Sequence, residues 1–193
     1  FRHVLEDIET LNRRAERGEF EVTAMSVHAW AHLRDKYALL STGASMGDGY
    51  GPILIVKKDA PIVTAESLSG KRIAIPGKWT SAALALSLRL PRHTPVVCDF
   101  KDVGNQVQSG AVDAGLIIHE GQLTAVEEGF RVVEDLGRWW KDRNGLPLPL
   151  GMNAVRSDLP EPQRLAIARA LAESVAFGLD NRASALDHAM TYE

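Results

Sequence analysis

The chain has 193 residues, enough for one compact domain or two small lobes with a buried core. Its 22 basic and 25 acidic residues give a net charge of −3, which argues against a protein that binds nucleic acid or a membrane surface by electrostatics. The single cysteine excludes an internal disulfide and favours a reducing compartment. No apolar run approaches the about 18 residues of a membrane span, and no signal-peptide pattern is present, so we expect a cytoplasmic protein.

The first half of the chain predicts alternating helices and strands. Asp7 is a typical N-cap for a helix that carries Ile8, Leu11 and Ala15 on one face and ends near Gly18. Apolar patterning then predicts, in order, a strand at 21–26, a helix at 29–37, and strands at 38–40 and 53–56. A glycine-rich stretch between the last two strands, residues 43–52 (GASMGDGYGP), is predicted to form a turn.

The second half repeats the pattern of strand, turn and helix after a linker-like stretch at residues 57–70. Expected strands lie at 72–75, 96–100, 116–118, 132–135 and near 152–155. Expected helices lie at 80–90, 103–109 and 161–179. This alternation predicts an α/β fold with mostly parallel sheets, and the loose connection at 57–70 indicates two lobes with a cleft between them.

A histidine follows one of the predicted strands. Leu116, Ile117 and Ile118 form an apolar run typical of a strand buried on both faces, and His119 comes next. In an open α/β sheet, ligands bind outside the carboxyl ends of the strands, and histidine exchanges protons near neutral pH. His119 is therefore either a catalytic base or a residue that hydrogen-bonds a neighbouring backbone group, and spacing alone does not separate the two.

The predicted start of the helix at 80–90 is a candidate ligand site. Residues 77–82 (GKWTSA) follow a strand and open this helix, where free N–H groups and adjacent hydroxyls suit a carboxylate or phosphate. Thr80 also has the residue type of an N-cap, and the two roles are compatible. The glycine-rich stretch at 43–51 lacks the Gly-Lys-Ser/Thr ending of a Walker loop and precedes a strand, so it is either a turn or a place of close backbone approach to a ligand.

Other chemistry is less well supported. His28 and His32 have helical i, i+4 spacing, but no His-Glu-x-x-His motif is present and a solvated helix face is favoured over a metal site. Residues 43–47 match the Gly-x-Ser-x-Gly sequence of a nucleophile elbow, with Ser45 at its centre, but they lack the strand–turn–helix context of that motif. We therefore discount Ser45 as a nucleophile. Cys98 lies in a predicted strand and has the character of a small buried hydrophobe. The Trp139-Trp140 pair is predicted to cover a core edge, with a stacking wall for an aromatic ligand as the alternative.

Five segments together resemble the 1,4-dihydroxy-6-naphthoate synthase family of menaquinone biosynthesis by the futalosine pathway. They occur in the family's order and cover nearly the whole chain. They are residues 5–12 (LEDIETLN), 43–52 (GASMGDGYGP), 76–82 (PGKWTSA), 114–120 (AGLIIHE) and 145–151 (GLPLPLG). The last two together are the most specific part of the resemblance.

The resemblance implies a two-lobed fold similar to periplasmic binding proteins, with the ligand in the cleft. It implies a lyase that converts cyclic dehypoxanthinyl futalosine to dihydroxynaphthoate and releases a sugar-derived fragment, with a carboxylated small molecule as partner and with no metal or organic cofactor. The family's proposed base falls on His119. The substrate-contacting residues of the family fall on Ala24, Met25, Ser26, Ser81 and Ala82. Thr80, at the predicted helix start, is added to this expected site because its hydroxyl suits an anion.

The resemblance also sets the expected lobes and the alternatives. Family members open with a strand and a Ser-Pro-Cys-Pro-Asn-Asp-like loop that this chain lacks, and they often carry a basic residue where Ala24 stands. We expect a first lobe made of residues 1–70 and 156–193, without its first strand, and a second lobe made of residues 71–155. The alternatives are the related chorismate dehydratase, which typically has Gly-Asp in place of His119 and Glu120, and a solute-binding module without catalysis. The sequence leaves a homodimer open.

Overall fold

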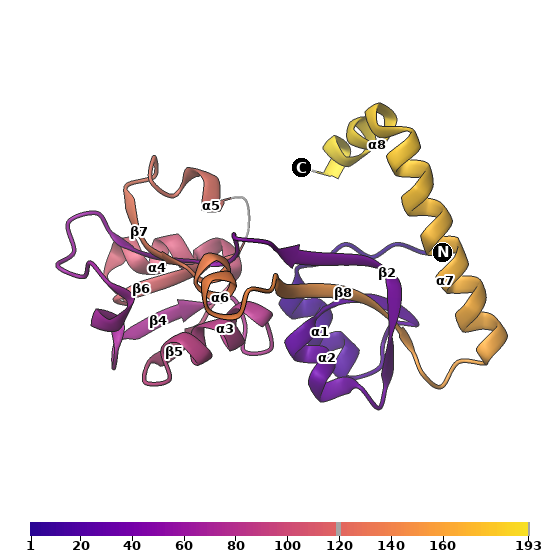
Figure 1. The fold of residues 1–193 in the computed structure, drawn as a ribbon, viewed down its shortest axis with the longest axis horizontal. Coiled ribbons are helices and arrows are strands. Elements are labelled where there is room, and N and C mark those ends of the chain that lie inside the picture. Colours follow the sequence, from indigo (N-terminus) through magenta and orange to yellow (C-terminus); the bar gives the residue numbers. More distant parts are fainter. Residues whose placement is uncertain (119–120, 193) are drawn as a thin grey trace.

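The computed structural model of the protein describes residues 1–118 and 121–192. Its strands form two sheets that lie side by side in two lobes (Figure 1). The three-stranded sheet has the order β1 (Val22–Ser26), β8 (Leu148–Arg156), β2 (Tyr37–Gly47). The five-stranded sheet has the order β5 (Thr94–Val97), β4 (Arg72–Ile75), β6 (Ala114–Ile117), β3 (Ile53–Lys57), β7 (Phe130–Asp135).

The helices flank these sheets. They are α1 (Ile8–Glu16), α2 (Val27–Leu33), α3 (Ser81–Arg89), α4 (Val103–Ser109), α5 (Gly121–Thr124), α6 (Leu136–Asn144), α7 (Glu161–Asp180) and α8 (Arg182–Ala189). Short 3₁₀ turns are η1 (Ala65–Leu68), η2 (Phe100–Asp102) and η3 (Met190–Tyr192). In Figure 1, α1 and α2 lie with the three-stranded sheet, and α7 and α8 extend from its outer side as an arm. Within the described residues, no helix combines the length and apolar character needed to cross a membrane.

The five-stranded sheet is covered by apolar side chains on both faces. Successive residues of a strand point to opposite faces, and in β3 this places Leu54 in one buried cluster and Ile55 in the other. The first cluster includes Leu86 of α3 and Leu136 of α6, whereas the second includes Val107 of α4. Burial of both faces explains why these strands have continuous rather than alternating apolar sequences.

The strand directions correct one expectation. Four of the six strand pairings among the described residues are antiparallel, and only β4 pairs in parallel, with β5 and β6. Helical crossovers produce parallel neighbours, but β3 and β8 are reached by connections between the lobes. Each of these two strands is inserted between neighbours that run the other way, so the expectation of mostly parallel sheets is confirmed only in part, by the pairings of β4.

The two sheets also divide the chain at points other than the expected lobe borders. The strand β3 belongs to the five-stranded sheet although it precedes residue 70, and β8 belongs to the three-stranded sheet although nearly all of it precedes residue 156. The chain therefore changes sheet between β2 and β3 and again between β7 and β8, and both connections run between the lobes (Figure 1).

Several element bounds differ from the sequence prediction. The helix expected at 29–37 is α2, which ends at Leu33, and the fully buried Tyr37 begins β2. The strand β2 continues to Gly47 through much of the expected turn. It does so with a break in register between Leu39 and Ala44, where Gly43 has a φ of 79°. This irregularity allows a glycine-rich segment to remain in a sheet.

Candidate functional site

Most of the buried polar side chains lie near the junction of the two lobes, whereas Thr23 lines a cavity beside α7. Such groups are informative because burial of a polar side chain costs free energy unless it is hydrogen-bonded. Among the described residues, the polar or charged side chains classed as buried all belong to α1, to β1 or to the first residues of α3: Glu9, Asn12, Thr23, Ser26, Thr80 and Ser81. This set includes three of the residues that the sequence predicts to bind substrate.

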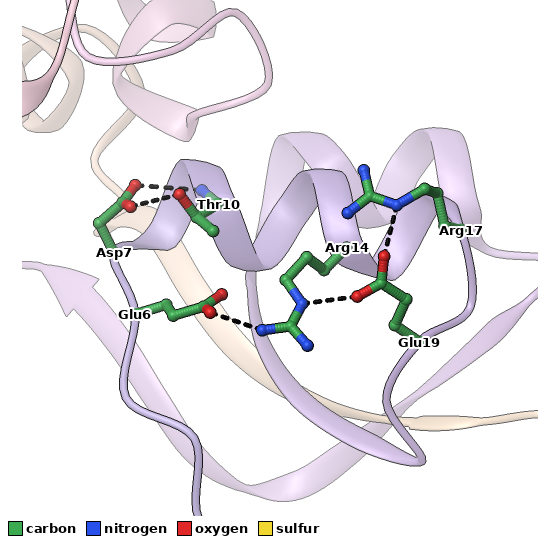
Figure 2. Close-up of polar contacts among 6 residues, drawn as sticks. All are labelled: Glu6, Asp7, Thr10, Arg14, Arg17 and Glu19. Carbon is green, nitrogen blue, oxygen red and sulfur yellow. Dashed lines mark hydrogen bonds and ion pairs between the residues drawn. The ribbon is translucent and has the colours of Figure 1, made fainter.

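The helix α1 is held by its N-cap and by charged contacts along its outer side. The Asp7 carboxylate accepts hydrogen bonds from the backbone N–H groups of residues 9 and 10, which confirms it as the N-cap. Figure 2 shows Arg14 between Glu6 and Glu19, with nitrogen–oxygen distances of 2.5 and 2.7 Å, and Glu19 also contacts Arg17. These contacts connect α1 to the residues just before and just after it.

Asn12, on the inner face of α1, holds Ser26. The fully buried Asn12 side chain donates from Nδ2 to Ser26 Oγ at 3.1 Å and accepts from the Ser26 backbone N–H at 2.9 Å. Asn12 is not among the residues predicted from the sequence to bind substrate. A signal was available, because Asn12 is four residues after Ile8 and three before Ala15, on the face predicted to be buried.

Ala24 and Met25, the two other predicted residues of β1, face different surroundings. Met25 is fully buried in the small core of the three-stranded lobe. Ala24 is exposed and lines a cavity of about 440 Å³ between the N-terminal segment, β1 and α7. The alternation of side chains along a strand explains the difference. Ser26, the third residue of this segment, is buried and hydrogen-bonds to Asn12 of α1.

Thr80 and Ser81 have hydroxyls that are engaged within the protein. Thr80, 2% exposed, is the N-cap of α3: its Oγ1 accepts from the Ala83 N–H at 3.1 Å and donates to the Gly77 carbonyl at 2.9 Å. Ser81 Oγ donates to the Leu150 carbonyl at 2.6 Å and accepts from the His28 N–H at 3.3 Å. The hydroxyl of Ser81 thus joins α3 to both α2 and β8.

Ala82, the last predicted substrate-binding residue, contributes its methyl group to the core of the five-stranded lobe. Its neighbour Ser81 is the residue of this pair that faces the other lobe. The predicted helix start is therefore correct, and the first turn of α3 lies against α2.

Glu9 of α1 contacts the other lobe at Gly77. It is 8% exposed, its Oε1 accepts from Arg13 Nε at 3.1 Å, and its buried Oε2 has no hydrogen-bond partner among the described residues. A Cβ added to Gly77 would lie 2.1 Å from this Oε2, so the glycine is what allows the carboxylate to approach the loop before α3. A side chain at position 77 would force the lobes or the carboxylate to move.

His28 and His32 form the solvated helix face that the sequence favours only in part. The ring of His28 is half-buried, and its Nδ1 lies 3.2 Å from the Thr80 carbonyl oxygen. His32 is exposed, but its ring stacks on Trp79 at a centroid distance of 5.4 Å. The two Nε2 atoms are 3.3 Å apart. Burial lowers the pKa of His28, although the Thr80 bond and the Glu9 charge act in the opposite direction.

His119, the predicted base, and its neighbour Glu120 lie outside the described residues. The strand before them, β6, lies between β4 and β3 within the five-stranded sheet. The role of His119 therefore stays a prediction.

Two further residues considered from the sequence have structural roles. Burial raises the pKa of the Cys98 thiol, which disfavours the nucleophilic thiolate at neutral pH. Trp140 packs against the core, as expected for a side chain that covers a core edge.

The fold and the junction define a class of protein. Solved structures of similar architecture include the alkanesulfonate-binding protein SsuA from Xanthomonas axonopodis pv. citri, with a TM-score of 0.64 and 19% identity over 92% of this chain and 62% of that chain. Another is a mutant of ArgBP from T. maritima, with a TM-score of 0.62 and 17% identity over 91% of this chain and 71% of that chain. This chain has the two-lobed α/β fold of periplasmic binding proteins, as the sequence predicts.

Closer relatives give the family. The profile of the family described as "Menaquinone biosynthesis" matches residues 1–193. The chain is 42% identical to a 1,4-dihydroxy-6-naphthoate synthase of Thermus thermophilus and 32% identical to one of Streptomyces coelicolor, over 96% of its own length and 66% of theirs. A crystallised protein from Archaeoglobus fulgidus has a TM-score of 0.90 and 49% identity over 99% of this chain and 70% of that chain. The chain belongs to the menaquinone biosynthesis family, and it spans just under two thirds of the length of these curated relatives.

Proposed function

We propose that the protein is a 1,4-dihydroxy-6-naphthoate synthase, a lyase that acts on cyclic dehypoxanthinyl futalosine. The 42% identity to the Thermus thermophilus synthase supports this activity. The observation that carries the proposal is the contact between two segments that are far apart in the sequence, around Ser26 and around Ser81. Asn12 and the His28 backbone join these segments into one buried polar cluster.

In this proposal the junction binds the polar parts of the substrate. Ser26 Oγ accepts a hydrogen bond from Asn12, so the proton of this hydroxyl remains available to a substrate oxygen. The first turn of α3 supplies the positive end of a helix dipole, which favours a carboxylate. We assign binding to the two predicted segments, residues 24–26 and 80–82, which are connected by the hydrogen bond from the His28 N–H, two residues after Ser26, to Ser81 Oγ.

The proposed base is His119. A neutral imidazole removes a proton next to a carbonyl, the carbon–carbon bond to the sugar-derived part breaks, and the ring system becomes aromatic. Proton transfer by a positioned side chain contributes about 10²–10⁴-fold to the rate of such a step. The proposal places the reaction in the cytoplasm, with a carboxylated small molecule as the partner and no organic cofactor.

The test is conversion of cyclic dehypoxanthinyl futalosine by the full-length protein, followed by chromatography and mass spectrometry. We expect dihydroxynaphthoate to appear in proportion to enzyme, and we expect His119→Gln to lower kcat by about 10²-fold or more. His93→Gln is the matched control, because the His93 ring bonds to the Leu90 carbonyl at the opposite end of α3 from Thr80.

Other outcomes would replace the proposal. Saturable binding without product would indicate a solute-binding module. Consumption of chorismate in place of the futalosine derivative would indicate the related dehydratase. Full activity in His119→Gln would contradict the assignment of the base while leaving the reaction in place.

A further inference from the structure

We propose that His28 and His32 form a binding site for a divalent first-row transition-metal ion, at the junction between the lobes. Imidazole nitrogen is a common ligand for such ions. The i, i+4 spacing places both rings on one side of α2, one above the other. The proposal is independent of the synthase activity.

The separation of the two nitrogens fits a shared ion. His28 Nε2 and His32 Nε2 are 3.3 Å apart. Two imidazole nitrogens that each lie about 2.0–2.1 Å from a tetrahedral zinc ion are themselves about 3.3–3.4 Å apart. The two nitrogens therefore already have the separation that a shared ion requires, and without an ion the same distance suits a hydrogen bond between the two rings.

The surroundings of His28 leave its Nε2 atom available to bind a metal ion. The Thr80 carbonyl can only accept, so the 3.2 Å contact places the proton on His28 Nδ1 and leaves a lone pair on Nε2. Metal-binding histidines almost always donate their other ring N–H in this way, to a carbonyl or a carboxylate, and the donation fixes the tautomer and the ring orientation.

His32 supplies an oriented and accessible second ligand. Its ring stacks on the ring of Trp79, with a centroid distance of 5.4 Å and an interplanar angle of 25°. This contact with a residue of the other lobe restrains the orientation of the His32 ring. The side chain is exposed, so an ion can arrive from solvent. The described residues hold no group of three or more His, Cys, Asp or Glu side chains placed to bind a metal, so water completes the coordination in this proposal. Such an open site gives the affinity order Cu²⁺ above Ni²⁺ and Zn²⁺.

The test is titration of tag-free, full-length protein with CuCl₂, NiCl₂ or ZnCl₂, followed by calorimetry. We expect one ion per chain and a Kd that rises at least tenfold in His32→Gln and in His28→Gln. His93→Gln is the matched control and should bind as the wild type does. Because a ligand that binds only the folded state raises its stability, the same ions should raise the Tm of the wild type and leave the Tm of His32→Gln unchanged.

Fluorescence gives a second measurement that does not depend on the folding of the histidine variants. Cu²⁺ bound between the rings would lie beside Trp79 and quench its indole. Trp79→Phe should therefore lose most of the quenching and keep the calorimetric stoichiometry. Unchanged affinity in His32→Gln, or no saturable binding by the wild type, would overturn the proposal and leave the pair as a hydrogen bond within α2.

Discussion

The two lobes are stabilised in different ways. The five-stranded lobe is built from two clusters of buried apolar side chains, one on each face of its sheet. The three-stranded lobe has smaller apolar clusters. Its inner helix α1 contributes a buried amide and a nearly buried carboxylate, Asn12 and Glu9. Apolar burial therefore stabilises the five-stranded lobe, whereas specific hydrogen bonds between polar side chains hold the junction where the substrate is proposed to bind.

Removing a large apolar side chain from the five-stranded lobe should have the greatest effect on stability. Leu116 is fully buried in β6, and Leu116→Ala should lower the free energy of unfolding by about 2–5 kcal/mol, because it removes apolar contacts and leaves a cavity. Leu88→Ala on α3 is the control, since that side chain is 52% exposed. Denaturant unfolding of both variants measures the effect. A loss below 1 kcal/mol for Leu116→Ala would contradict this view of the lobe.

Gly77→Ala should disturb the junction itself. The added methyl would meet the Glu9 carboxylate, and we expect a loss of about 1–3 kcal/mol, as for other overpacked sites. Glu9→Ala should remove the clash, so the double variant should recover part of the loss, and a double-mutant cycle measures this coupling. Gly178→Ala on α7 is the control, because its nearest neighbour would be 3.9 Å away. Additive effects of the two junction changes would show that Glu9 and Gly77 do not interact.

Asn12→Ala should weaken the hydrogen bonding at the junction of the lobes. The variant loses two hydrogen bonds to Ser26, and we expect about 1–3 kcal/mol of destabilisation because buried polar groups are left unpaired. In the proposed synthase KM should also rise, since Ser26 is no longer held. Asn144→Ala, at the exposed end of α6, is the control for both measurements. An unchanged KM would remove Asn12 and Ser26 from the proposed substrate site.

The smallest effect concerns pH. Burial lowers the pKa of His28, so as the pH falls the unfolded chain takes up a proton before the folded protein does. The contribution of His28 to stability is therefore present above its unfolded pKa of about 6.5 and is lost as the pH falls through and below that value. Denaturant unfolding at pH 7.5 and 5.5 should show a greater loss for the wild type than for His28→Gln. Equal losses would mean that the folded protein does not disfavour the charged ring.

Local signals explain what the sequence predicted well. The N-caps Asp7 and Thr80 and the helix α4 were predictable, because capping residues and periodicity act within a few positions. The antiparallel insertion of β3 and β8 was not, since it depends on connections between lobes. The same applies to the site. Ser26 was predicted from a family resemblance, and Ser81 from both that resemblance and the start of a helix. Glu9 and Asn12 have no such signal, because they are ordinary polar residues of a helix until the fold buries them.

The most direct test of the central claim is a map of where the substrate binds. Hydrogen exchange of the full-length His119→Gln variant should be measured with and without cyclic dehypoxanthinyl futalosine. We expect protection to increase in two separate segments, around Ser26 and around Thr80 and Ser81, at the junction of the lobes. Protection confined to other parts of the chain, with these two segments unchanged, would contradict it.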